Sequence, residues 1–419
     1  EETTGGTGGV GGEGGVGGAV VSDCTGVEDG TDCIGGGGIY DFFGLCVAGS
    51  CEDLTRCEND DFCREYNDCR TDTCLNNGLC DEGGAVEDGT QCAGGTCQSG
   101  VCVLESTVLP CSEQGIRNAI AAGGGPYTFD CEGPTSIVTQ AEIVIDNDVI
   151  LDGEGRLTVD GADTHTVLVV DRGITVELRS LAIANGGPAD GDGGGIYSEG
   201  VLTLIDSDVR DCTASTGGGI ASNGSLTLVG STVSGNDAQL GGGIRNDGDF
   251  AVLRTSTVSG NTANEGGGGI ANGISALTLI NSTLSGNSTN AIHAVHDPED
   301  PPVNLVMAGT LIEGDCVVGG PAAIVSNGYN IESPGDTCGF DQTGDQSGVT
   351  AAQLNLGPLT DNGGLTMTHK PGDGGFGDGS VAIDQIPEAD CEVDTDQRGE
   401  PRPETGGTMC DVGALEVQP

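Results

Sequence analysis

A short line of sequence occurs twice, about 25 residues apart, and it constrains the fold more than any other feature. The stretch STVSGNDAQLGGGIRNDG covers residues 231–248, and TSTVSGNTANEGGGGIANG follows at 255–273. A catalytic motif normally occurs once in a domain, whereas a recurring line describes a structural unit that stacks on itself. We therefore expect much of this chain to be a repeat array.

Each repeat contains three short apolar segments separated by Gly, Asn and Asp. The first segment places one isoleucine per repeat, at steps of 24, 24 and 26 residues, at Ile196, Ile220, Ile244 and Ile270. The second supplies an apolar pair, which we assign to Leu202/Leu204, Leu226/Leu228, Phe250/Val252 and Leu277/Leu279. The third supplies one apolar residue, at Val209, Val233, Val258 and Leu284. Three strands per period, each alternating between inside and outside, describe one coil of a parallel β-helix.

The periodic region covers residues 140–345 and predicts an all-β protein built on a parallel β-helix, a solenoid. About eight coils, spaced at roughly 4.8 Å, would form a rod about 40 Å long. Asn236, Asn261 and Asn287 each follow the third apolar residue of their coil by three positions. Asparagines stacked in this way are expected to hydrogen-bond along the rod as a ladder.

Cysteine usage divides the chain and indicates an oxidising compartment. Of the 19 cysteines, 12 lie in residues 20–106, where VEDGTDC at 27–33 recurs as VEDGTQC at 86–92. No Cys-x2-Cys occurs, and no histidine precedes His165, so disulfides explain this region better than zinc. Outside it we expect three disulfides, Cys111/Cys131, Cys316/Cys338 and Cys391/Cys410. Cys212, at the ladder position of its coil, is the odd cysteine: either a small buried residue or an intermolecular thiol.

A segment with a regular glycine repeat precedes the cysteine-rich region. Residues 1–19 form a Gly-Gly-X arm, and a period of three matches polyproline-II-like geometry. In that geometry one edge of the arm is lined by Thr7, Val10, Glu13, Val16 and Ala19. A flexible linker is the alternative interpretation. Under the first, the arm docks on a neighbouring subunit and joins the chains into an open filament.

Residues 107–139 predict a small capping segment ahead of the first coil. Ser112 is a suitable N-cap, and Gly123 can end the helix that follows. The positions of Ile116, Ala119 and Ile120 put three apolar side chains on one helical face. An amphipathic helix in front of a repeat array is suited to cover the first exposed coil.

The charge balance restricts the partners of the chain. It carries 65 Asp and Glu against 13 Lys and Arg, a net charge of −52. Phosphates would be repelled, which excludes nucleic acid and disfavours an anionic membrane surface. No apolar run is long enough to span a bilayer, so we expect no membrane span. With the cysteines, and with a start at Glu1 that is typical of a chain after signal-peptide removal, the sequence predicts an extracellular or cell-surface protein.

Acidic turns make calcium the one cofactor that we consider, and we expect no organic cofactor. Asp190 and Asp192 lie in ADGDGGG, and Asp206 and Asp208 share an outward face of the next stretch. Carboxylate oxygens on flexible turns suit this hard cation, and solvated turn acids are the alternative. His293 and His296 are spaced to share a metal, although we expect a solvated loop there.

Two parts of the chain resemble known families. The repeat GGGI…VSGN is similar to the repeats of polymorphic outer-membrane proteins. Residues 346–419, which contain LGPLTDNGGLTMTHKPGDG, GSVAIDQ, TDQRGEPRP and CDVGALE, resemble the choice-of-anchor Q domain of secreted bacterial proteins. Pieces of residues 20–106, DGTxC and C-x4-C, resemble disintegrin-like cysteine-rich regions. The resemblance implies a right-handed parallel β-helix exported to the bacterial cell surface, and it implies no catalytic residues.

Motifs of the common catalytic classes do not occur in the sequence. There is no G-x-S-x-G, H-E-x-x-H or P-loop, and the arginines of the rod have no convergent spacing. We therefore expect a non-enzymatic structural protein, a homopolymeric subunit of a fibre, stalk or surface matrix. An adhesin that binds a glycan or a protein at the cell surface is the alternative, and a polysaccharide lyase-like enzyme is the third interpretation.

Overall fold

The structure, a computed structural model, describes residues 107–187, 190–297, 299–376 and 379–418, and the backbone of eight short strands before residue 105. The chain forms two compact units, of which the first comprises Glu1–Cys92 and Thr96–Cys102 and the second Ala93–Gly95 and Val103–Pro419. The predicted Gly-Gly-X arm, with Thr7, Val10, Glu13, Val16 and Ala19, lies outside the described residues. So does most of the cysteine-rich region.

The strands before residue 105 form small separate sheets. A three-stranded antiparallel sheet contains β1 (Asp32–Gly35), β2 (Phe42–Val47) and β3 (Ser50–Asp53). A hairpin pairs β4 (Thr73–Cys74) with β5 (Cys80–Asp81). The third sheet contains β6 (Gln91–Cys92), β7 (Gly95–Gln98) and β8 (Val101–Leu104).

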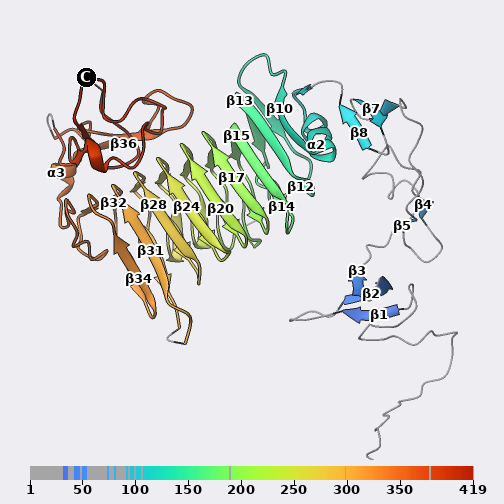
Figure 1. Cartoon of the computed structure of the whole chain (residues 1–419), viewed down its shortest axis with the longest axis horizontal. Helices are drawn as coiled ribbons and strands as arrows, with labels where there is room; N and C mark the ends of the chain where they lie inside the picture. The colour runs from blue at the N-terminus through green and yellow to red at the C-terminus, as the bar shows by residue number, and fades with distance from the viewer. Residues whose placement is uncertain are drawn as a thin grey trace, which may run out of the picture. The chain divides into compact units, whose positions relative to one another are not determined.

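The second unit is a parallel β-solenoid with three sheets, which we call the first, second and third faces (Figure 1). The first face is an eight-stranded sheet of one strand per coil. Its strands are β12 (Ile143–Ile145), β14 (Leu168–Val170), β16 (Ile196–Ser198), β19 (Ile220–Ser222), β23 (Ile244–Asn246), β27 (Ile270–Asn272), β30 (Ile292–Val295) and β33 (Cys316–Gly319). The prediction of an all-β parallel solenoid of about eight coils is confirmed.

The second and third faces run through the same coils. The second contains β10 (Gly124–Phe129), β13 (Val149–Asp160), β15 (Thr175–Ala184), β17 (Val201–Ile205), β20 (Ser225–Val229), β24 (Phe250–Arg254), β28 (Ala276–Ile280), β31 (Val303–Ala308) and β34 (Ala322–Ser326). The third contains β11 (Thr135–Val138), the later parts of β13 and β15, β18 (Asp208–Arg210), β21 (Thr232–Ser234), β25 (Thr257–Ser259), β29 (Thr283–Ser285), β32 (Leu311–Glu313) and β35 (Ile331–Ser333). β9 (Val108–Leu109) pairs in parallel with β10 at the first coil. β22 (Asp237–Leu240) and β26 (Thr262–Gly266) form a separate two-stranded sheet.

The core is a set of aliphatic columns, one residue of each column coming from each coil. Ile196, Ile220, Ile244 and Ile270 are in register on the first face and are fully buried. On the second face Leu226 pairs with Ala251, and Leu228 pairs with Leu253. Identical spacing in successive coils therefore places apolar side chains directly above one another, where each removes its neighbour from water.

The predicted core pair Phe250/Val252 is wrong by one residue. Ala251 and Leu253 point inward instead, and the Phe250 side chain is 40% exposed. This coil has one extra residue before its second strand, because seven positions separate Ile244 from Ala251 whereas six separate Ile220 from Leu226. Phe-Ala-Val-Leu is apolar in both alternations, so the local pattern did not distinguish the two registers.

The asparagine ladder forms as predicted. The backbone N–H and the side-chain amide of Asn236 both donate to Oδ1 of Asn261, at 3.0 Å each. Asn261 makes the same two bonds to Oδ1 of Asn287, at 3.1 and 3.0 Å. Cys212 occupies the next position of the ladder: its N–H donates to Asn236 at 2.9 Å and its side chain is 1% exposed. Burial raises the pKa of the Cys212 thiol to about 12.

A second column of polar side chains stands at the turn between the second and third faces. Residues with positive φ bend the chain there in six successive coils, at Ser180, Asp206, Gly230, Thr255, Asn281 and Gly309. A buried serine follows in four of them, at Ser207, Ser231, Ser256 and Ser282. Each of the first three serines donates its N–H to the hydroxyl of the serine in the next coil. Hydrogen bonds therefore connect this turn from coil to coil, as they do at the asparagine corner.

The first coil is closed by a helix, α2 (Glu113–Ala122). The Ser112 hydroxyl accepts the N–H of Gly115, and Gly123 ends the helix with φ of 65°. The three predicted apolar residues, Ile116, Ala119 and Ile120, are buried against the core. A disulfide joins Cys111 to Cys131 across this segment, and another joins Cys316 to Cys338 near the last coil.

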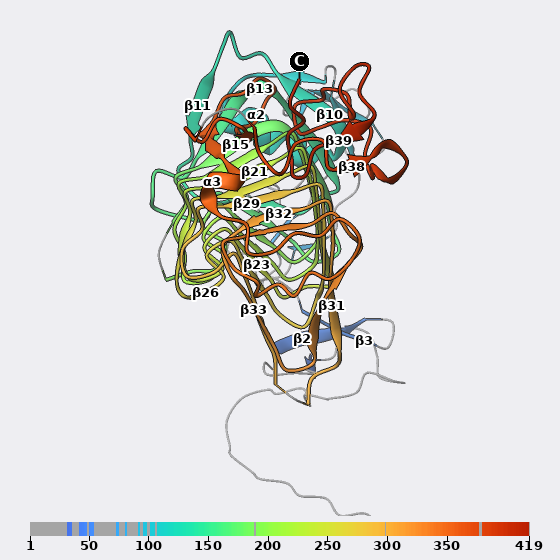
Figure 2. The same ribbon diagram turned by 90° about the vertical axis from the view of Figure 1, so that its left-hand side faces the viewer.

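The C-terminal region has little regular structure and folds back on the solenoid (Figure 2). It contains α3 (Ala351–Leu354), β36 (Leu356–Thr360), β37 (Thr368–Pro371), β38 (Ile386–Pro387), the 3-10 turn η1 (Glu388–Asp390) and β39 (Met409–Cys410). β36 pairs with β37, and β38 pairs with β39, both antiparallel. Cys391 and Cys410 form the third disulfide outside residues 20–106.

Substitutions on neighbouring residues of one strand test the register of the second face. Leu228→Asp buries an unpaired carboxyl group and should destabilise the solenoid by several kcal/mol, about 3–5. Thr227→Asp, whose side chain points outward, should change stability by less than about 1 kcal/mol. The same contrast should hold between Leu253→Asp and Val252→Asp. Thermal unfolding followed by far-ultraviolet circular dichroism measures it, and equal effects within a pair would show that the register is wrong.

Cys212→Asn should extend the asparagine ladder by one coil and raise stability by about 1 kcal/mol. Space is available because Gly195 lies beside Cys212 as Gly219 lies beside Asn236 in the next coil. Cys212→Ala, which leaves the N–H of Gly186 without its sulfur acceptor, is the matched control and should destabilise. A lower melting temperature for the asparagine variant than for the alanine variant would contradict the ladder at this coil.

Candidate functional site

The C-terminal region covers the outer surface of the third face. Thr232, Thr257 and Thr283 point outward there, yet each is at most 2% exposed. The Gln397 amide bridges two coils, since its nitrogen donates to Thr232 at 2.8 Å and its oxygen accepts from Thr257 at 2.6 Å. The Thr283 hydroxyl accepts the N–H of Ala414 at 2.9 Å. The recurring threonine of the STVSGN line is therefore an attachment point for the chain's own C-terminal region.

Apolar contacts continue this attachment at the last coils. Leu311 and Ile331 occupy the outward positions where earlier coils have threonine, and both are fully buried. They form a second hydrophobic cluster with residues of the C-terminal region, among them Leu354, Ile386 and Val412. The outer surface of the third face and the C-terminal region thus enclose a second, smaller hydrophobic core.

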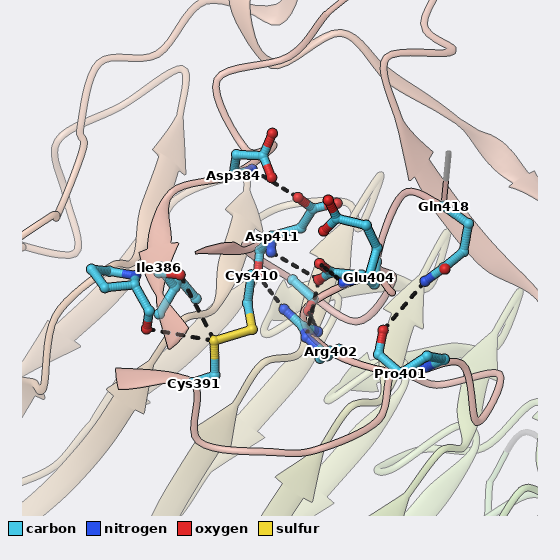
Figure 3. Close-up of a disulfide and its surroundings, with 12 residues drawn as sticks. Asp384, Ile386, Cys391, Pro401, Arg402, Glu404, Cys410, Asp411 and Gln418 are labelled. Carbon is cyan, nitrogen blue, oxygen red and sulfur yellow. Dashed lines mark hydrogen bonds and ion pairs between the residues drawn. A yellow bond between two sulfur atoms is a disulfide. The ribbon is translucent and has the colours of Figure 1, made fainter. Parts of the chain in front are cut away.

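The C-terminal region contains an ion pair without solvent contact, and Figure 3 shows its arginine, Arg402, beside Cys410 and Asp411. Arg402 and Glu416 are fully buried, with 3.3 Å between Nε and Oε2. Nη1 of Arg402 donates to the Gly413 carbonyl at 2.7 Å, and Glu416 accepts the N–H of Asp411 at 2.8 Å. The Cys391–Cys410 disulfide ends directly before Asp411. Buried charges that are paired and hydrogen-bonded stabilise one arrangement of the chain, and removal of either partner is costly.

The motifs that resemble the choice-of-anchor Q domain supply these contacts. Gln397 and Arg402 belong to TDQRGEPRP, Glu416 to CDVGALE, and His369 to the HKP stretch. His369 is also structural, because its Nε2 lies 2.8 Å from Ser259 and its Nδ1 lies 2.7 Å from the Gly357 carbonyl. None of these residues has a role that could be predicted from the sequence, and the ordered C-terminal motifs that contain them were the one available signal.

The four aspartates of the calcium prediction lie in two kinds of place. Asp190 and Asp192 lie in the exposed turn before β16, where Asp192 accepts a hydrogen bond from Thr216 at 2.7 Å. Asp206 occupies the positive-φ turn before β18, and Asp208 begins β18. Within the described ranges, no three acidic, histidine or cysteine side chains gather as a metal site would require. Calcium stays a prediction.

Asp208 is the most perturbed of these carboxyl groups. Burial raises its pKa to about 6, although the Arg210 guanidinium opposes that change. Burial also raises the pKa of Asp206 above its usual range. A carboxylate placed on the outer third face and then covered is costly to ionise, because it loses hydration without gaining a full ion pair.

The histidine pair is not in a solvated loop, contrary to our expectation. His293 lies in β30, and His296 follows the strand with its side chain only 9% exposed. Nε2 of His296 lies 3.2 Å from the Asn272 carbonyl. Burial and the nearby Arg245 lower the pKa of His293. His293 belongs to the first face and His296 follows directly after its strand, which favours a packing role for both side chains.

A polar cleft of about 440 Å³ lies between the last coils and the C-terminal region. Its lining includes Asn281, Tyr329, Asp390 and Glu392, and the Tyr329 hydroxyl donates to Asp390 at 2.8 Å. The volume is within the range of small-ligand sites. Its lining carries two carboxylates and no cationic side chain, so it suits a neutral or cationic polar ligand.

The outer surface of the second face has a different character. Over six successive strands, from β17 to β34, its outward side chains are aliphatic, threonine, serine or asparagine, apart from one phenylalanine and one arginine. They are Val201, Thr203, Ile205, Ser225, Thr227, Val229, Phe250, Val252, Arg254, Ala276, Thr278, Ile280, Asn304, Val306, Ala308, Ala323 and Val325. No carboxylate stands among them, although the chain has 65. We call this surface the carboxylate-free face.

Comparisons with known proteins identify no relative. No family model matches the sequence, no curated protein matches it, and no solved structure matches the fold. Among the described residues, no helix has both the length and the apolar character needed to cross a membrane.

Stability should depend on pH through Asp208. Its carboxyl is held protonated in the folded state up to a pKa of about 6, so folding stability falls as pH rises from about 4 to about 6. Asp208→Asn should stabilise the protein by about 2 kcal/mol at pH 8 and by almost nothing near pH 4. Calorimetric melting at both pH values measures this. Asp190→Asn, on the exposed turn, controls for the loss of one negative charge, and an equal gain in both variants would contradict the assignment.

Proposed function

We propose that this protein is a secreted, non-enzymatic structural protein that forms part of an extracellular fibre, stalk or surface matrix. Its subunits join through the Gly-Gly-X arm of residues 1–19. The solenoid supplies a rigid rod in which each coil is tied to the next by backbone pairing, aliphatic columns and two polar ladders. Such a rod transmits load along its axis because every coil contacts only its neighbours.

The observation that carries the proposal is the kind of side chain found on the outer surface of two long faces of the rod. One long face is covered by the chain's own C-terminal region, through Gln397 and the apolar cluster around Leu311. Another, the carboxylate-free face, presents aliphatic and threonine side chains in register over six coils. These groups supply neither nucleophile nor acid, and a repeated flat surface of this kind is suited to contact with another surface.

Localisation outside the cell is supported by the cysteines. Three disulfides lie in the described part of the second unit, and 12 further cysteines precede it. Disulfides persist in oxidising compartments. The resemblance of residues 346–419 to the choice-of-anchor Q domain supports export to a bacterial cell surface and a right-handed solenoid.

The alternative function is an adhesin or a binding module, and the polar cleft favours it. Asp390, Glu392 and Asn281 are groups that hydrogen-bond to hydroxyls, so a neutral sugar is the ligand class that fits. Binding on a glycan array that is lost in Tyr329→Phe/Asp390→Ala would favour this alternative. A calcium requirement for assembly is a further proposal, and chelation before assembly tests it.

Deletion of residues 1–19 tests the structural function. The full chain should form fibres visible by negative-stain electron microscopy. The deleted chain should remain folded, with the same circular dichroism, and should form none, because the contact between the arm and its acceptor is heterologous. Replacement of the arm by a Gly-Ser sequence of equal length controls for linker length. Fibres that persist in the deleted chain would show that the arm is only a linker.

A further inference from the structure

We propose that two copies of this chain pair through the carboxylate-free face, so that assembled rods associate laterally. This inference rests on the proposed structural function and names a second contact, which does not involve the arm. The partner is a second copy of the same chain, related by a two-fold axis parallel to the axis of the rod.

Electrostatics and the width of the sheet together favour this surface. Two copies that each carry a net charge of −52 repel one another over most of their surfaces. The repulsion is weakest where no carboxylate stands between them, and that condition holds on six successive strands of the second face. The third face is already covered by the C-terminal region. The strands of the first face also carry no outward carboxylate, but most of them present a single outward residue. The second face presents two or three outward residues per strand, and it is open apart from Ser225, Ile280 and Ala308, which are buried.

The side chains of this face are suited to packing. Val201, Phe250 and Val325 are 43%, 40% and 38% exposed, large values for apolar residues on a sheet. The middle column, which contains Thr203, Thr227 and Thr278, is short and uniform in height, so the surface is flat. Two such sheets pack at about 10 Å with their side chains interdigitated. Apolar area on both copies is removed from water in the process.

One charged residue fixes the orientation. Arg254, at the end of β24, is exposed and forms no ion pair with any described residue. Asp249, directly before the start of the same strand, is also exposed, and its carboxylate accepts a hydrogen bond from the Ser225 hydroxyl at 3.5 Å at the margin of the face. A two-fold axis along the rod reverses the strand direction and keeps the coil level, so Arg254 of one copy lies beside Asp249 of the other. Two symmetric ion pairs result, one at each margin of the interface.

The area of the face sets the strength of the contact. Six strands at about 4.8 Å, each of about five residues at roughly 3.3 Å, cover about 450 Å² per copy. That is about half of what a stable protein interface buries per partner. A single pair should therefore be weak, with a dissociation constant in the micromolar range or above. Along a polymer, where many such faces are held in a row, the contact gains strength by multivalency.

The pair is tested by sedimentation velocity on the full chain over a range of concentrations. Salt at about 0.5 M screens the mutual repulsion, so association should strengthen relative to about 0.05 M. Thr227→Asp, which places a carboxylate in the centre of the face, should weaken pairing at least about tenfold. The matched control is Val144→Asp on the first face, whose side chain is 41% exposed and which should pair as the wild type does. Unchanged pairing in Thr227→Asp would overturn the proposal.

A charge exchange tests the two-fold axis. Arg254→Asp and Asp249→Arg should each weaken pairing, and the double variant should restore it, because each new aspartate again faces an arginine of the other copy. Failure of the double variant to restore pairing would overturn this orientation. Thermal melting of each variant, unchanged from wild type, confirms that the fold is intact.

Electron microscopy separates this inference from the proposed function. If both hold, the arm deletion abolishes fibres, whereas Thr227→Asp leaves fibres that remain single instead of lying in pairs. Wild-type fibres that are never paired, together with a chain that stays monomeric at high salt, would contradict the inference and leave the proposed function intact. Absence of fibres in every variant, with the pair still seen in sedimentation, would contradict the proposed function alone.

Discussion

In-register stacking of one coil on the next is the interaction on which the rest of this structure depends. Residues such as Leu204, Leu228, Leu253 and Leu279 lie directly above one another, so each covers the next and none reaches solvent. The backbone pairs at every step, and asparagine and serine columns repeat this pairing at two corners. An extra residue is absorbed in the turn before β24, and Ala251 and Leu253 keep the register of the neighbouring coils.

The apolar surface of the rod is covered in different ways at its first coil and along its third face. At the first coil a single capped helix, α2, covers the apolar column ends. Along the third face the chain returns and attaches to its own threonines through Gln397. The buried Arg402–Glu416 pair lies within the returning segment. The C-terminal region therefore acts as part of the fold, and its sequence motifs describe packing. Two surfaces of the described solenoid are candidates for function, the carboxylate-free face and the polar cleft near Tyr329.

Most of the solenoid could be predicted from the sequence, and the one register error shows where that prediction reaches its limit. The spacing from the second to the third apolar position is five residues in the coils from β17 to β31, as from Leu204 to Val209 and from Leu228 to Val233. Applied to Val258, that constant selects Leu253 and rejects Val252. The error arose because alternation was judged within one strand, whereas the register is set by the neighbouring coils.

By itself the sequence determined the parallel solenoid, the capping helix, the asparagine ladder and the place of Cys212 at the ladder position of its coil. Each depends on a period or a local signal that stays close in the chain. Only the tertiary structure decided what covers the third face, because Gln397 lies 165 residues from Thr232 and 140 from Thr257. The carboxylate-free face became visible for the same reason. Its residues come from six coils, and only the stacking of the coils places them on one surface. The acidic residues that separate them in the sequence lie outside that surface.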